Sequence, residues 1–317
     1  MPPHNDAIAL ITCSYGPDFQ RCARLCRSVD RWVSPGIRHQ LIVPARDLPR
    51  FAPLQNHRRT VLAVEDVVPA RFRQLPRTQG WWLDEQGWPL RGWIMQQVTK
   101  LSANRASPAE HLVFADSDLV FIRPFGAADI LRAGRLRLHR IPGAKDSGEH
   151  LRWHHRAADL LGIERRYFGS DYIGQLISWR RSHLEGLQQH LEQTLQRPWH
   201  RGVARSLRVS EYILYGAYID AVVGLADSGH YPVADDLCHC CWFRDEADAL
   251  AAGREAPGAA TVAVLLQSNL GLSDAQEQTI LNHIRTRLSE GLAALKNCCS
   301  SPRNCLIRRR AGARSRA

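Results

Sequence analysis

The stretch HLVFADSDLVFI, from His111 to Ile122, decides the fold expected for this chain. An apolar run of this length is typical of a buried strand, and Asp116 and Asp118 interrupt it. Buried carboxylates stay ionised only where a cation or hydrogen-bond donors compensate their charge. We therefore interpret the two acids as ligands of a divalent metal. The alternative is a carboxylate pair at the sheet edge that caps a turn or pairs with Arg123.

The segment before this strand has helical spacing. One stripe of the expected helix is apolar: Ile94, Val98 and Leu101. The neighbouring stripe holds Trp93, Gln97 and Lys100. Because the helix leads into the strand, this second stripe is expected along the rim where the strand ends, which makes Lys100 a candidate phosphate contact. The alternative is a solvated lysine favoured by the helix dipole.

Strands alternate with helices in the first half of the chain. The expected elements are strands at Ile8–Thr12, His39–Val43 and Arg59–Val64, with a helix at Phe19–Trp32. This order predicts an α/β protein with a mostly parallel sheet flanked by helices. Ligands of such sheets lie beyond the carboxyl ends of the strands, so Thr12-Cys13-Ser14-Tyr15 and Asp116-Ser117-Asp118 are expected to meet at one crevice.

The second half continues with mixed elements. We expect strands at Arg135–Ile141, Ile173–Trp179 and Val262–Leu266, and helices at His150–Leu161, Arg181–Gln193, Val209–Val223 and Ser273–Leu292. Glycine and proline interrupt Arg73–Arg91 too often for a regular element there. Its tryptophans Trp81, Trp82 and Trp88 either stack on a ligand or fold back onto the core.

Six motifs in order carry a family resemblance. They are Thr12-Cys13-Ser14-Tyr15, Gly92-Trp93-x-x-Gln96-Gln97-x-x-Lys100-Leu101, Phe114-Ala115-Asp116-Ser117-Asp118-Leu119-Val120-Phe121, Gly169-Ser170-Asp171-Tyr172, Ser210-Glu211-Tyr212-x-x-Tyr215-Gly216 and Gln267-Ser268. Over about residues 7–270 the chain resembles GT-A-type glycosyltransferases. More narrowly, it is similar to a poorly characterised bacterial glycosyltransferase-like family.

The resemblance implies a GT-A-like catalytic domain over residues 1–300, with a nucleotide-binding half at about 7–125 and an acceptor half at about 126–300. It implies transfer of a sugar from a nucleotide-sugar donor to a carbohydrate or glycoconjugate acceptor with Mn²⁺ or Mg²⁺. Asp116, Asp118 and His239 would hold the metal, although an ordinary hydrogen-bonded histidine is the alternative for His239. Donor contacts would come from Thr12, Ser14, Tyr15, Gln97, Lys100 and Asp116.

Two further acids are candidates for the acceptor side. Glu211 follows Ser210, a good helix cap, and shares a helical face with Tyr215, which we expect to line an acceptor groove. Glu211 is then the candidate general base. Its alternative role is to compensate the positive end of the helix dipole. Asp171, beside Gly169, is the rival for the base.

Two other functional classes stay open. A haloacid-dehalogenase-type phosphatase also uses an Asp-x-Asp sequence at a strand end, with the first acid as nucleophile. A non-catalytic nucleotide-sugar-binding protein could use the same scaffold.

Charge and cysteine content bear on partners and compartment. The formal charge is +11, and five arginines of that excess lie in the last ten residues: Arg308, Arg309, Arg310, Arg314 and Arg316. We expect residues 301–317 to be a disordered tail that contacts acidic surfaces, with no specific nucleic-acid partner. No apolar segment reaches membrane-spanning length. The nine cysteines, without an export signal, indicate the cytoplasm. Cys238 and Cys241 have zinc-site spacing, but no second such pair follows.

Overall fold

The computed structural model describes residues 7–76, 78 and 80–300, the last twelve of these by backbone alone. The described chain forms two compact units. The first runs to Cys240 and includes Ala259–Leu265, and the second comprises Cys241–Gly258 and the residues from Leu266 onward. The predicted tail at 301–317 lies outside the described residues.

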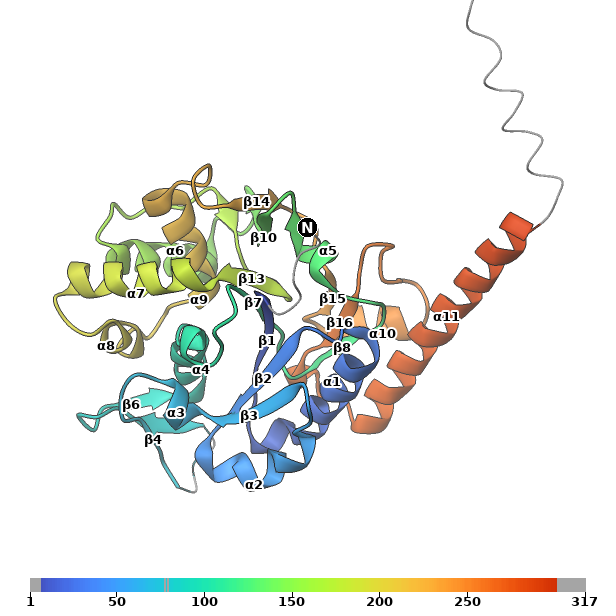
Figure 1. Cartoon of the computed structure of the whole chain (residues 1–317), viewed down its shortest axis with the longest axis horizontal. Coiled ribbons are helices and arrows are strands. Elements are labelled where there is room, and N and C mark those ends of the chain that lie inside the picture. Colours follow the sequence, from blue (N-terminus) through green and yellow to red (C-terminus); the bar gives the residue numbers. More distant parts are fainter. Residues whose placement is uncertain (1–6, 77, 79, 301–317) are drawn as a thin grey trace, which may run out of the picture. The chain divides into compact units, whose positions relative to one another are not determined.

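The first unit is built on a five-stranded sheet of order β13-β7-β1-β2-β3 (Figure 1). Its strands are β1 (Ile8–Cys13), β2 (Arg38–Val43), β3 (Arg59–Ala63), β7 (His111–Phe114) and β13 (Ile177–Arg180). Pairing is parallel between β1 and β2, β2 and β3, and β1 and β7, while β13 is antiparallel to β7. The predicted α/β class with a largely parallel sheet is therefore confirmed.

Helices cover both faces of this sheet because side chains alternate along each strand. On β1, Ala9, Ile11 and Cys13 join a core that includes Ile94 and Val98 of α4 (Gly92–Lys100). The intervening Ile8 and Leu10 pack in a second core with Leu25 and Val29 of α1 (Phe19–Trp32). Figure 1 shows α1 and α4 on opposite sides of the central strands. The bounds of α1 coincide with those expected from the sequence.

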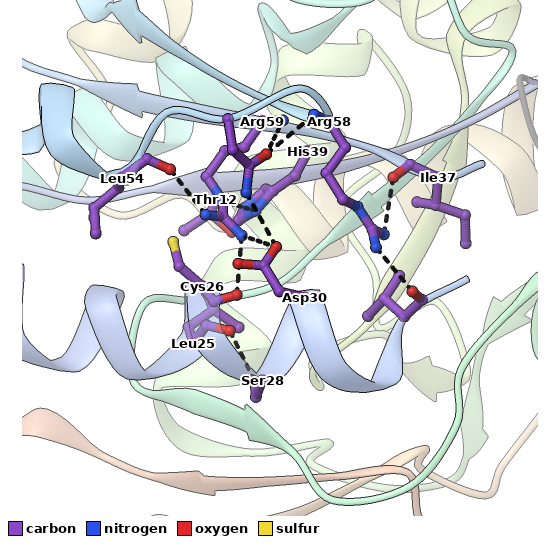
Figure 2. Close-up of polar contacts among 12 residues, drawn as sticks. Thr12, Leu25, Cys26, Ser28, Asp30, Ile37, His39, Leu54, Arg58 and Arg59 are labelled. Atoms are coloured by element: carbon purple, nitrogen blue, oxygen red, sulfur yellow. Dashed lines mark hydrogen bonds and ion pairs between the residues drawn. The ribbon is translucent and has the colours of Figure 1, made fainter. Parts of the chain in front are cut away.

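A buried polar cluster ties α1 to the first three strands (Figure 2). Arg59 on β3 donates to His39 on β2 at 2.9 Å and to Asp30 on α1 at 2.6 Å. Since Arg59 occupies Nδ1 of His39, the imidazole donates through Nε2 to the hydroxyl of Thr12, 3.0 Å away. Burial, with the charges of Arg59 and Arg58, lowers the pKa of His39 well below its usual value. His39 is therefore a neutral structural residue.

The strand expected around the two acids is divided. β7 ends at Phe114, and β8 (Leu119–Phe121) belongs to a different sheet, of order β15-β16-β8, with β15 at Cys238–Cys241 and β16 at Ala263–Leu266. Asp116 and Asp118 lie in the turn between these strands, where Leu119 N–H bonds to the Asp116 carbonyl. This turn therefore presents both acids at the edge of the central sheet.

A helical layer follows in the chain after β10 (Arg135–His139). It comprises α6 (Gly148–Leu161), α7 (Arg181–Leu195), α8 (Trp199–Ala204) and α9 (Glu211–Tyr218), which continues into a π-helical turn at Ile219–Val223. Tyr215 of α9 is fully buried, and its ring stacks on Trp179 at a centroid distance of 4.7 Å. The expectation that Tyr215 lines an acceptor groove is therefore wrong, because the apolar stack places it in the core.

Two local expectations also need correction. Arg73–Arg91 contains three short strands, β4 (Arg73–Gln74), β5 (Trp81–Leu83) and β6 (Pro89–Arg91), which form an antiparallel sheet. Asp84 closes the β5–β6 turn by accepting from the N–H groups of Gln86 and Trp88. The strand expected at Ile173–Trp179 begins only at Ile177, because Leu176 has a left-handed backbone with φ of 55°.

The structure places one tryptophan of this segment in the core, and ligand stacking by the others remains a prediction. Trp82 is 3% exposed and belongs to the core, whereas Trp88 is 61% exposed.

The second unit contains α10 (Arg244–Ala251) and α11 (Asp274–Ser300). At the start of α11, Ser273 N–H bonds to the Gln276 side chain and Gln276 N–H bonds to Ser273 Oγ. This reciprocal pair is a capping box, as the sequence predicts. Among the described residues, no helix combines the length and apolar character that crossing a membrane requires.

Candidate active site

The carboxyl ends of β1 and β7 lie side by side at the point where the strand order reverses. The chain passes from β1 to β2 and β3 on one side, and β7 then pairs with the other side of β1. Ala115 N–H bonds to the Ile11 carbonyl, so the segment after β7 stays beside β1 up to the acids. Such a switch point is where open α/β sheets bind ligands.

Lys100, the last residue of α4, is the centre of the site. Its side chain is 5% exposed, and Nζ lies 3.0 Å from Asp116 Oδ1 and 3.1 Å from Glu211 Oε1. Nζ also donates to the hydroxyl of Tyr212 at 2.8 Å. Three oxygens therefore surround the ammonium: the Tyr212 hydroxyl accepts a hydrogen bond from it, and the two carboxylates are its ion-pair partners. The phosphate contact predicted for Lys100 remains a prediction.

The charges of this cluster stabilise one another. Burial lowers the pKa of Lys100, but Asp116, Tyr212 and Glu211 outweigh it, so the net shift is well upward. Burial likewise raises the pKa of Asp116, but Lys100 and a hydrogen bond from Gln175 give a net lowering. Formal charges of +1 on Lys100 and −1 on each of Asp116 and Glu211 sum to −1. The cluster therefore carries a formal net charge of −1.

Gln175 holds the other side of Asp116. Its amide Nε2 donates to Asp116 Oδ2 at 2.7 Å, and its Oε1 accepts from the Asp116 N–H at 3.3 Å. Asp116 Oδ2 therefore accepts a hydrogen bond from Gln175, whereas Oδ1 lies 3.0 Å from Lys100 Nζ and has no hydrogen-bond partner among the described residues. Gln175 is not among the residues predicted from the sequence, because it lies in an irregular segment just before β13 that carries no sequence signal.

Asp118 lies near β15. Burial and the neighbouring Cys240 raise the pKa of the Cys238 thiol, and the carboxylates of Asp236 and Asp118 raise it further. His239 is half-buried on the same strand. Within the described part of the chain, no three His, Cys, Asp or Glu side chains converge closely enough to hold a metal ion by themselves. The metal set Asp116, Asp118 and His239 remains a prediction.

The residues at the end of β1 divide between the two faces of the sheet. The Cys13 thiol faces the site: burial raises its pKa to about 12, and its pKa also responds to Lys100, Asp116 and Glu211. Thr12 points to the opposite face, where it bonds to His39 and is fully buried. Ser14 is 9% exposed and Tyr15 38% exposed, just beyond the strand. Ser14 is buried and its side chain acts on the pKa of Cys22 on α1, so Tyr15 is the most accessible of the predicted donor contacts at this strand end.

Gln97 lies one helical turn before Lys100 on α4. It is 1% exposed, and neither its amide nitrogen nor its carbonyl oxygen has a hydrogen-bond partner among the described residues. A buried polar group left without a partner costs about 1–3 kcal/mol. This is the kind of residue that a polar ligand would satisfy, and it shares a helical stripe with Lys100, as the sequence predicts.

Trp93, at the start of the same stripe, is connected to the predicted acceptor residue Asp171 by a series of side-chain contacts. Trp93 is 44% exposed, and its ring lies 6.1 Å from Trp153 of α6. Trp153 packs against His150 at 4.8 Å, and His150 Nδ1 lies 3.4 Å from Asp171 Oδ1. Along α4, Trp93 and Lys100 are separated by roughly 10 Å, at about 1.5 Å per residue. Asp171 thus belongs to a second group, with His150, rather than to the lysine cluster.

Residues 6–288 of the chain match DUF6492, which is described as a family of unknown function. No curated protein matches the chain.

Proposed function

The chain belongs to the DUF6492 family, and we propose that it is a metal-dependent glycosyltransferase with a GT-A-like fold. It would transfer a sugar from a nucleotide-sugar donor to a carbohydrate or glycoconjugate acceptor. One observation carries the proposal: at the switch point of the sheet, the buried Lys100 faces the carboxylates of Asp116 and Glu211. A third acid, Asp118, follows Asp116 by two residues. The order of the central strands supports the same fold.

The charge of the cluster explains why a cation would be needed. Lys100, Asp116 and Glu211 carry a formal net charge of −1, and Asp118 makes the region more negative. A nucleoside diphosphate is itself an anion, so the site would repel it unless a cation bound as well. The available donors are carboxylate oxygens, which suit Mg²⁺ or Mn²⁺. Asp118, with Asp116, would hold the ion, and the bound ion would neutralise the diphosphate leaving group.

The chain's own residues would position the donor. Lys100 fixes the Asp116 and Glu211 carboxylates, and Gln175 holds Asp116 from the other side. The unpaired amide of Gln97 would bond to a polar group of the donor, since it combines one acceptor with two donor protons. Ser14 and Tyr15 would contact the nucleotide beyond the end of β1.

Glu211 would act as the general base. Its Oε1 contacts Lys100, and Oε2 is the oxygen that would take the proton of the acceptor hydroxyl. Asp171 would orient the acceptor together with His150, and the Trp93 and Trp153 rings would contact its sugar faces. If Asp171 were the base instead, His150 would be its partner.

The two alternative functions make different demands on Asp116 and Glu211. A phosphatase would need an oxygen of Asp116 as the nucleophile, and Oδ1, which lies 3.0 Å from Lys100 Nζ and has no hydrogen-bond partner among the described residues, would be that oxygen. A binding protein would need no base, so it would tolerate loss of Glu211.

Incubation with a panel of UDP- and GDP-sugars tests the proposal. We expect Mn²⁺-dependent release of the sugar, lost in Asp118→Asn and reduced roughly 10²–10⁴-fold in Glu211→Gln, as for loss of a general base. Asp66→Asn and Glu164→Gln, at exposed positions, are the matched controls. Binding without turnover would identify a binding protein. Release of phosphate from a phosphomonoester, with no action on any nucleotide-sugar, would identify a phosphatase.

The cytoplasm remains our proposed compartment. The six cysteines whose side chains the structure describes are free thiols, as a reducing compartment favours: Cys13, Cys22, Cys26, Cys238, Cys240 and Cys241.

A further inference from the structure

A cavity of about 480 Å³ opens in the first unit, apart from the lysine cluster and on the side of Asp171, whose charge acts on the lining residue Tyr167. Its lining includes Arg140, Arg166, Tyr167, Phe168, Asp220 and Leu225. None of the residues of the lysine cluster contributes to it. The volume lies within the range of small-molecule sites, about 300–1,000 Å³.

Asp220 gives this cavity an unused acceptor. Its Oδ2 accepts from Arg140 Nε at 2.8 Å and from the Tyr172 hydroxyl at 2.6 Å. Its Oδ1 is buried and has no hydrogen-bond partner among the described residues. Two donors thus fix the carboxylate in orientation while one oxygen stays unsatisfied, which suits a hydroxyl supplied by a ligand.

The backbone around Asp220 is irregular at the same point. α9 changes at Ile219 into the π-helical turn Ile219–Val223, which carries Asp220 into the cavity lining. Single π-helical turns are rare and occur frequently at functional sites. The irregular turn and the unpaired oxygen are therefore two independent features of one wall.

The charge of the lining favours an anion. Arg140 and Arg166 contribute +2 and Asp220 contributes −1, a formal sum of +1. Arg140 is paired with Asp220, whereas Arg166 is exposed at the rim of the cavity. The Arg166 guanidinium lies 5.6 Å from the centre of the Phe168 ring, which keeps it beside the cavity. A guanidinium in this position binds a carboxylate or a phosphate through paired hydrogen bonds.

We propose that this cavity is a second ligand site, which binds a sugar that carries an anionic group. The anion pairs with Arg166, a sugar hydroxyl donates to Asp220 Oδ1, and the apolar parts of Tyr167 and Leu225 contact the ring. Asp220 follows Glu211 by nine residues on one helix, so the two sites are roughly 13 Å apart, at about 1.5 Å per residue. A single sugar cannot reach both, and the inference does not depend on the proposed transferase activity.

Calorimetric titration with glucuronic acid, glucose 6-phosphate and glucose tests the site. We expect the two acidic sugars to bind and glucose to bind far more weakly. Arg166→Gln should weaken both acids by roughly 10- to 100-fold, the usual effect of losing a charge-assisted contact. Arg135→Gln removes the same charge at an exposed position outside the cavity and should change nothing. Binding of only one acidic sugar identifies the anion as carboxylate or phosphate.

A second variant makes the test independent of Arg166. Ala221→Phe places a ring in the lining and should abolish binding of the acidic sugars while UDP and GDP binding stays intact. Equal affinity for glucose and the acids would overturn the proposal. Binding of the acidic sugars that survives both Arg166→Gln and Ala221→Phe would also overturn it. Loss of that binding in Asp118→Asn would overturn it too, because the ligand would then belong to the candidate active site.

Discussion

Removing the ammonium of Lys100 should be the most damaging single polar substitution in the candidate site. In Lys100→Met the volume is nearly kept, but Asp116 and Glu211 lose their shared counter-charge. Breaking a buried ion pair by deleting one partner costs about 3–5 kcal/mol, because the remaining charge is buried without compensation. The Glu211 side chain is 8% exposed and that of Asp116 is 26% exposed. We therefore place the loss near the lower limit, at about 3 kcal/mol of unfolding free energy at neutral pH.

The pH dependence gives this prediction a definite sign. In the native protein the pKa of Asp116 is lowered, so its pairing stabilises the fold above the ordinary value of 3.8 and is lost as pH falls through the lower folded pKa. In Lys100→Met, burial, which already acts to raise the pKa of Asp116, is no longer opposed by the ammonium. The penalty is then full above the raised pKa of Asp116 and decreases as that carboxyl becomes protonated. The stability difference between the two proteins should therefore shrink from pH 7.5 to pH 4.

Urea unfolding followed by tryptophan fluorescence measures these differences. Glu211→Gln and the double variant Lys100→Met/Glu211→Gln complete a cycle, and the double variant should be more stable than Lys100→Met because it buries one charge fewer. Two results would refute the reasoning: a loss below about 1 kcal/mol in Lys100→Met, the level of an exposed ion pair, or losses that simply add in the double variant.

Three further substitutions separate structural roles from ligand contacts. Thr12→Val should lower the unfolding free energy by about 1–3 kcal/mol, because the buried His39 N–H loses its acceptor, and should leave nucleotide affinity unchanged; lost affinity with unchanged stability would make Thr12 a ligand. Gln97→Leu should raise thermal stability, because it removes an unpaired buried amide, and weaken UDP or GDP binding; lower stability would mean that the amide is already satisfied. Gly216→Ala places a methyl group 2.3 Å from two ring carbons of Tyr172 and should cost about 1–3 kcal/mol in urea unfolding; an unchanged midpoint would show that the ring moves away freely.

The sequence predicts the frame of this site better than its contacts. The periodicity of Ile8–Thr12, Phe19–Trp32 and the stripe of Gln97 and Lys100 is strong, so these elements form as expected. The alternation of side chains along a strand predicts that Thr12 and Cys13 face opposite sides of the sheet. Which of the two faces α4 depends on how that helix packs, and α4 lies far along the chain from β1.

The contacts with Lys100 and Asp116 depend on residues distant in sequence. Tyr212 and Glu211 reach Lys100 from more than a hundred residues away, and Gln175 reaches Asp116 from an irregular segment. A left-handed residue such as Leu176 carries no sequence signal, because a γ-branched side chain at positive φ is rare. The burial of Tyr215 escaped prediction for a related reason: helical spacing pairs it with Glu211, yet its ring fits against Trp179.

Calorimetry of UDP and GDP binding is the most direct test of the central claim, that the negatively charged cluster at the ends of β1 and β7 binds a diphosphate through a divalent cation. We predict binding of one of these nucleotides in Mn²⁺ and loss of that binding both in chelator and in Asp118→Asn, with Asp66→Asn unchanged. Equal affinity of either nucleotide with and without chelator would contradict the account.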